Sequence, residues 1–274
     1  MNAGLLSKPA KGLILASGLL IGLSTLVSAD TGTVSLAAQA NTALASFYSS
    51  PPAGPVLPNT TVPFDLSSGN FVYLANGTSA TFATSYKNPK HVYLLVNSSF
   101  TYYWYATRTA GQVTLTFSDG STQTVNLTIG GNLREWRVGA GSIVVGTASS
   151  TDSKNAWSGY AQGWMGGGSA VLDQLAITVD AANTTKTLTG VSVNRVNDDM
   201  SVHLLVSGLT VDYTTITYPG NSGNTESIDH RQNVGHSNAP KFTTGGGETA
   251  SNKSVATAAP QKGKRLAHGK AQAD

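Results

Sequence analysis

The chain has 274 residues, of which 11% are charged, and its sequence contains no cysteine. The lack of cysteine excludes disulfide bonds and zinc–thiolate sites. The formal net charge of +3 is unevenly spread, because residues 30–215 hold eight basic and ten acidic side chains, whereas residues 216–274 hold seven and four. A nucleic-acid-binding domain carries its basic residues on the folded part, so this distribution argues against a nucleic-acid partner.

Residues 1–29 have the three parts of a secretory signal peptide. Two lysines form a basic start, residues 12–26 are apolar, and Val27-Ser28-Ala29 offers small side chains to a signal peptidase. An uncleaved signal anchor is the alternative, although the apolar run is shorter than the roughly 20 residues that a membrane span needs. We therefore predict an exported protein, secreted or at the cell surface, whose mature chain begins at Asp30 and has no membrane span.

Residues 30–61 have the composition of a linker-like segment ahead of a domain. Apolar residues have a mild helical spacing over 33–47, and the stretch Pro51-Pro52-Ala53-Gly54-Pro55 then interrupts it. Proline has no backbone donor and fixes φ, so it breaks regular structure. We expect the domain to begin near Val62.

Residues 62–215 show alternating apolar and polar side chains in short runs, separated by turns rich in Gly, Asn, Asp and Ser. No helical period is sustained between these runs. This pattern predicts an all-β domain, specifically an antiparallel β-sandwich of jelly-roll type. The expected strands are 62–66, 70–75, 79–85, 90–97, 100–106, 111–118, 121–129, 133–138, 142–147, 156–164, 170–180, 185–195 and 201–213.

Asp119-Gly120 joins two of these runs in an expected β-hairpin. Apolar residues occupy odd positions over 113–117 and again over 125–129. A two-residue loop would place the two apolar sets on opposite faces, because side chains alternate with period two. A three-residue loop over 118–120 places both sets on one face, with Gly120 supplying the positive φ of a bulge. We therefore expect the three-residue loop.

The apolar pattern ends after Tyr218-Pro219. Residues 216–274 are rich in Gly, Asn, Ser, Thr, Ala and Lys, and near their end lies the basic stretch Lys262-Gly263-Lys264-Arg265. Such a segment buries too little apolar surface to offset the entropy of ordering it. The sequence predicts a disordered basic tail.

The stretch GQVTLTFSDGSTQTVNLTIGGNLREW, residues 111–136, has a strand, a DG turn, a second strand and a G-x-N-x-R-x-W-like segment. It resembles the galactose-binding-domain-like β-sandwich modules that secreted bacterial proteins append to glycoside hydrolases. Ala156-Trp157-Ser158-Gly159 is similar to their downstream A-W-x-G element. The resemblance covers residues 64–213. It implies a jelly-roll sandwich of carbohydrate-binding type, and it does not imply a catalytic site.

Sequence signals for catalysis are poor. The chain has no nucleophile elbow, zinc-protease motif or phosphate-binding loop. Three of the five histidines lie in the tail, and His91 and His203 lie at or in expected strands, where a structural role suffices. Asp198-Asp199 fits a turn, with calcium ligation as the alternative. We expect no enzyme activity and no cofactor.

Aromatic side chains are the better lead, because an exposed ring stacks on the apolar face of a sugar. On the expected strand 100–106, Tyr102 and Trp104 would face one way and Tyr105 the other. Trp136 and Trp157 also suit a sandwich core, which is the alternative for them. Polar side chains beside the rings would add specificity: Arg108, Asp152, Lys154 and Asn155. The candidate ligand-binding residues are Tyr102, Trp104, Tyr105, Trp136, Trp157, Tyr160 and Trp164.

These observations favour a secreted, non-catalytic carbohydrate-binding protein whose partner is a polysaccharide or glycan surface. The alternative is a structural or adhesive protein of the cell surface or matrix, held by its basic tail and lacking a sugar site. A small secreted hydrolase comes third, because only the expected compartment supports it.

Overall fold

The computed structural model describes residues 26–139 and 143–217. The expected disordered tail, residues 216–274, lies almost entirely outside the described residues. Most of the expected signal peptide lies outside them too. Its last residues, 26–29, form the start of strand β1 (Leu26–Val34), where Val27 pairs with Ile216 and Ala29 with Thr214. Cleavage after Ala29 stays a prediction, and it would leave β1 beginning at Asp30.

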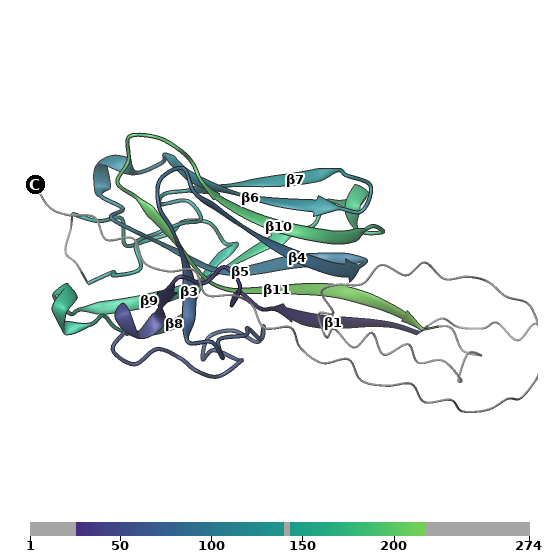
Figure 1. Ribbon diagram of the computed structural model, residues 1–274, viewed down its shortest axis with the longest axis horizontal. Helices are drawn as coiled ribbons and strands as arrows, with labels where there is room; N and C mark the ends of the chain where they lie inside the picture. The colour runs from purple at the N-terminus through teal and green to yellow at the C-terminus, as the bar shows by residue number, and fades with distance from the viewer. Residues whose placement is uncertain (1–25, 140–142, 218–274) are drawn as a thin grey trace, which may run out of the picture. The chain divides into compact units, whose positions relative to one another are not determined.

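Two antiparallel sheets pack together (Figure 1). The larger sheet has the order β2-β3-β11-β5-β9-β8, and β1 also pairs with β11. Its strands are β2 (Thr42–Ala43), β3 (Asn70–Leu74), β5 (Pro89–Ser99), β8 (Ser153–Tyr160), β9 (Ser169–Thr178) and β11 (His203–Thr217). The smaller sheet has the order β4-β10-β6-β7. Its strands are β4 (Ser79–Lys87), β6 (Thr109–Phe117), β7 (Thr122–Thr128) and β10 (Thr187–Arg195).

The strand order is that of a jelly roll. Four strands of the larger sheet, β3-β11-β5-β9, face β4-β10-β6-β7, and the chain passes repeatedly from one sheet to the other. Two interleaved Greek keys produce this arrangement, in which strands far apart in sequence become neighbours. The predicted all-β, antiparallel jelly-roll sandwich is confirmed.

Most of the expected strands are present, but four are not. Only isolated bridges are formed by residues 62–66, 133–138 and 143–147, the described part of the expected strand 142–147. Residues 100–106 form a loop with a 3₁₀ turn, η2 (Tyr103–Tyr105). Positive φ angles at Phe100 (59°) and Thr107 (69°) turn the chain at both ends of this loop. The alternation expected for Tyr102, Trp104 and Tyr105 therefore does not apply.

The β6–β7 hairpin has the expected register. Thr116 pairs with Thr122 and Val113 with Val125, so the loop is residues 118–120. Gly120 has φ of 82°, which suits glycine because it has no side chain to clash. The prediction of a three-residue loop is confirmed.

The domain has two hydrophobic clusters, one on each face of the larger sheet. The first fills the space between the sheets. The second lies on the outer face, where Leu95, Leu172 and Leu205 point away from the first. Residues from the segment expected as a linker cover this outer face with buried side chains: Leu44, Tyr48 and Leu57. The domain therefore begins before Val62, because its central sheet has an apolar outer face that the preceding segment covers.

Candidate ligand-binding site

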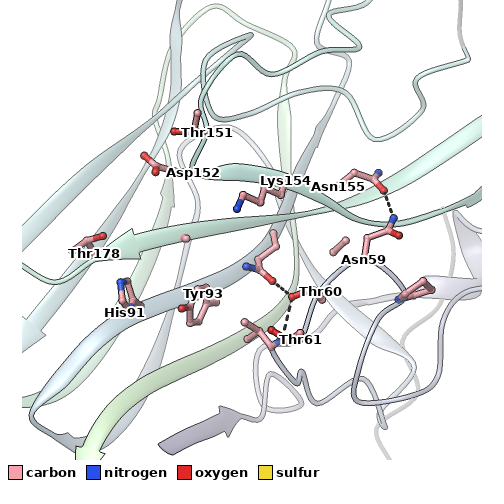
Figure 2. Close-up of a pocket in the computed structure, with 15 residues that line it drawn as sticks. Asn59, Thr60, Thr61, His91, Tyr93, Thr151, Asp152, Lys154, Asn155 and Thr178 are labelled. Carbon is pink, nitrogen blue, oxygen red and sulfur yellow. Dashed lines mark hydrogen bonds between the residues drawn. The ribbon is translucent and has the colours of Figure 1, made fainter. Parts of the chain in front are cut away.

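A groove lies on the part of this outer face that the second cluster leaves uncovered. Its floor comes from β5, β9 and β8, which are neighbours in the larger sheet, and one wall is the loop over residues 58–62 (Figure 2). Its volume is about 710 Å³, within the range of small-molecule sites. The lining residues are Pro58, Asn59, Thr60, Thr61, Val62, His91, Tyr93, Thr151, Asp152, Lys154, Asn155, Ala156, Gln174, Ala176 and Thr178.

Strand register arranges the floor in rows. His91 of β5 is opposite Thr178 of β9, and Tyr93 is opposite Ala176. Because side chains alternate between the two faces, His91 and Tyr93 point outward while Val92 and Leu94 fill the core between the sheets. Ala176 is small, so the Tyr93 ring has no bulky neighbour across the strand pair.

Tyr93 is the aromatic element of the groove. Its ring stacks on that of His91, with centroids 5.7 Å apart and planes 27° apart. His91 Nδ1 lies 2.9 Å from Asp212 Oδ2, which fixes the imidazole. Partial burial, and secondarily the charge of Asp212, raise the pKa of Tyr93 above its usual value. The phenol is protonated at neutral pH, as an ordinary tyrosine is, and can donate a hydrogen bond.

The loop over residues 58–62 is tied to the sheet by hydrogen bonds. Asn59 Nδ2 donates to Asn155 Oδ1 at 2.9 Å, and the Asn59 backbone N–H donates to the Ala156 carbonyl at 3.1 Å. The Thr60 hydroxyl bonds to the Gln174 side chain. Figure 2 shows the Asn59–Asn155 bond bridging the loop and β8. This wall is thus preformed.

Lys154 and Asp152 supply charge at the β8 wall of the groove. Both residues are exposed, and in the described part of the chain neither forms an ion pair. The ammonium and the carboxylate give the wall one charge of each sign, which suits a neutral ligand better than an ion.

Two of the expected binding residues are core residues. Trp136 is 2% exposed and Trp157 is 9% exposed. Both rings make edge contacts with Tyr48, at centroid distances of 5.3 and 5.5 Å. Neither ring presents a face to a ligand, because the segment ahead of Val62 covers both of them.

In the segment that resembles galactose-binding-domain-like modules, residues 111–136, the polar residues have structural roles. Asn132 Oδ1 accepts the backbone N–H of Thr128 at 2.8 Å and so closes a turn. Arg134 forms a two-point ion pair with Asp173 of β9 and donates to the Gly146 carbonyl. These residues join the β7–β8 connection to the sheet.

The remaining expected aromatics lie on two loops at one end of the sandwich. Trp104 is 55% exposed, in the loop after β5, and Trp164 is 73% exposed, in the loop before β9. Since β5 and β9 are antiparallel neighbours, the end of one and the start of the other lie at the same end of the sheet. We name the exposed apolar side chains there the aromatic end: Phe100, Tyr103, Trp104, Ile143, Tyr160 and Trp164.

The other two members of the expected set are only half exposed. Tyr102 stacks on Trp104, with centroids 4.6 Å apart and planes 15° apart. Tyr105 lies under the guanidinium of Arg108, 5.7 Å from the ring centroid. Both residues support the loop, and they present less surface than Trp104.

Asp198 and Asp199, the alternative calcium ligands, are each engaged by an arginine. Asp198 accepts from Arg195 at 2.8 Å, and Asp199 accepts from Arg108. Among the residues that the structure describes, no group of three or more His, Cys, Asp or Glu side chains is placed to hold a metal ion. Over the same residues, no helix is both long and apolar enough to cross a membrane.

Comparisons with known proteins add no assignment. A scan against protein-family models, a search of curated proteins and a search of solved structures each found no match. Function must therefore be inferred from the groove and the aromatic end.

Sequence reasoning missed most of the groove. It gave His91 a structural role and did not include Tyr93 among the candidate binding residues, although both side chains line the groove. Three of the polar residues that it named, Asp152, Lys154 and Asn155, do line the groove. They lie beside Tyr93 and Asn59, not beside exposed tryptophans.

Proposed function

We propose that this protein is a non-catalytic carbohydrate-binding protein and that the groove over β5, β9 and β8 is its binding site. The observation that carries the proposal is the composition of the groove. One aromatic ring, Tyr93, lies among amide and hydroxyl side chains and one charge of each sign. Sugar rings present an apolar C–H face and a rim of hydroxyl groups, so they use both kinds of contact.

The groove lacks the pair of catalytic carboxyl groups of a glycoside hydrolase. Such enzymes use two carboxyl groups flanking the scissile bond. Asp152 is the single carboxylate among the residues that line the groove. Asp212 lies near its margin, but His91 holds it at 2.9 Å. Binding without catalysis is the activity that this set supports.

The resemblance to galactose-binding-domain-like modules and the signal-like N-terminus support the same proposal. Together they indicate an exported protein that meets glycans outside the cell. N-terminal sequencing of the protein recovered from the medium should begin at Asp30. Recovery of a chain with intact Met1 in the membrane fraction would instead indicate a signal anchor.

Replacing Tyr93 by alanine should weaken saccharide binding by roughly 1–2 kcal/mol, about a tenfold rise in Kd, through the lost ring contact. Isothermal titration calorimetry against saccharides found by a glycan screen measures this. Tyr160→Ala is the matched control, since it removes an exposed tyrosine outside the groove and should leave Kd unchanged. Equal affinity of the Tyr93 variant and the unchanged protein would contradict the assignment.

A second candidate function is adhesion through the aromatic end. Of the nine large exposed apolar side chains among the described residues, six lie there. The first and last described residues, Leu26 and Thr217, pair with each other at the other end of β11. That strand places them roughly 45 Å from the aromatic end. The aromatic end is thus remote from the β1–β11 pairing at Leu26 and Thr217.

The backbone of the aromatic end carries strain. Phe100 is a bulky residue with φ of 59°, a conformation that is a genuine outlier for such a side chain. Strained residues persist where the surrounding structure enforces them, and they cluster at functional sites. Holding Phe100 open to solvent at this cost favours a contact surface.

The double variant Trp104→Ala, Trp164→Ala separates the two candidates. It should keep its Kd for soluble oligosaccharides, because neither ring lies in the groove. Retention on insoluble polysaccharide in a pull-down should fall several-fold, because two exposed ring contacts are lost. Unchanged retention would show that the aromatic end does not contact the polysaccharide.

A further inference from the structure

The two ends of the groove differ in exposure. At one end, Thr178 of β9 and Asp152 are exposed. At the other, Gln174 is 8% exposed and Ala156 is 1% exposed. The floor therefore runs from an open margin to a covered one over only a few residues of each strand.

The loop over residues 58–62 closes the covered end. Asn59 bonds to Asn155 through its side chain and to the Ala156 carbonyl through its backbone, while Thr60 bonds to the Gln174 side chain. The loop thus crosses both β8 and β9. In Figure 2 it passes beyond Lys154 and Tyr93, with Asn59 meeting Asn155 at that side.

Along β5, the described residues on the far side of the loop belong to the second hydrophobic cluster. The next outward-facing residue of β5 after Tyr93 is Leu95, which is fully buried in the second hydrophobic cluster. Val62, at the end of the loop, packs against the same cluster. From His91 to Leu95 the strand rises about 13 Å, so the open floor is shorter than this.

We infer that the groove binds the terminus of a saccharide chain and not an internal run of it. This inference rests on the proposed carbohydrate-binding function. A chain that crossed the groove would need two open ends, whereas here the loop blocks one of them. The amides of Asn59, Asn155 and Gln174, with Lys154 beside them, would bond the hydroxyl groups of the terminal unit.

The test uses the full chain with soluble galactan, xylan, mannan and hydroxyethyl cellulose, and with their di- to hexasaccharides. We expect a Kd per chain that is the same within twofold from the trisaccharide to the hexasaccharide. The binding capacity of a polymer per unit mass should rise in proportion to its number of ends after partial digestion with an endo-acting hydrolase. Affinity that grows tenfold or more with chain length, or capacity unchanged by digestion, would overturn the inference.

Asn59→Ala removes the side-chain bond that secures the closing loop. It should raise Kd for the trisaccharide by three- to tenfold. The control is Asn126→Ala, which removes an exposed asparagine bonded to Gln112 on the other sheet and should leave this Kd unchanged. Equal Kd values for the Asn59 variant and the unchanged protein would place the terminal unit elsewhere and overturn the inference. Failure of every saccharide to bind would overturn the proposed function itself, and the inference with it.

Discussion

Replacement of Asp173 by alanine should lower the free energy of unfolding by about 3–5 kcal/mol, the usual cost of removing one partner of a buried ion pair. Asp173 is 2% exposed, and its two carboxylate oxygens accept Arg134 Nε and Nη2, each at 2.6 Å. Asn97 Nδ2 also donates to it at 2.8 Å. The substitution leaves the Arg134 guanidinium and the Asn97 amide without their acceptor in a site that water reaches poorly. The free-energy cost of burying these two groups is then no longer offset.

Urea unfolding followed by tryptophan fluorescence measures this change. The matched control is Asp199→Ala, which breaks the exposed ion pair with Arg108 and should hardly move the unfolding midpoint, because exposed pairs contribute little. Asp173→Asn keeps one acceptor oxygen, so its unfolding midpoint should lie between those of the two alanine variants. A midpoint shift for Asp173→Ala no larger than that for Asp199→Ala would contradict the assignment of a buried, structural pair.

The free energy of unfolding should fall as pH rises from 5 to 8, and Glu135 should be the cause. Burial raises the pKa of this carboxyl from 4.5 to about 7, against the opposing effect of a hydrogen bond from Thr101 N–H at 2.8 Å. Between these values the folded protein keeps a proton that the unfolded chain releases. The stabilisation from this group is therefore complete below pH 4.5 and is lost as pH rises through 7, by about 3 kcal/mol in all.

Glu135→Gln isolates the effect, because glutamine has the shape of the protonated acid. The variant should match the unchanged protein at pH 5 and exceed its free energy of unfolding at pH 8. His203, whose pKa is lowered chiefly by burial, gives an opposite slope near its own titration, but it is present in both proteins and cancels in the difference. A difference between the two proteins that does not vary with pH would contradict the raised pKa.

The fold was predictable because its signals are local and repeated. The odd-numbered apolar positions on both sides of Gly120 determine the hairpin register, since only one loop length puts both sets on one face. Similar alternation marks β10 and β11. The pairing of these elements into two sheets then follows from the small number of ways in which such strands can bury their apolar faces.

The groove was not predictable, because its parts come from four separate segments. Nothing near Asn59 in the sequence indicates that its side chain will meet Asn155, and a proline-rich stretch usually lies outside a core. The covering of the outer face by Tyr48 and Leu57 has two structural consequences. It buries Trp136 and Trp157, and it leaves a groove over Tyr93.

NMR mapping of a bound saccharide on the isotope-labelled full chain tests the groove most directly. It uses the trisaccharide that binds most tightly in a glycan screen. Backbone amide shifts should change in three groups of residues, 59–61, 91–93 and 174–178, and in Lys154 and Asn155. Residues 102–105 and 160–164 should keep their shifts. Perturbation confined to those two loops, or no perturbation by any saccharide, would contradict the claim that the groove is a carbohydrate-binding site.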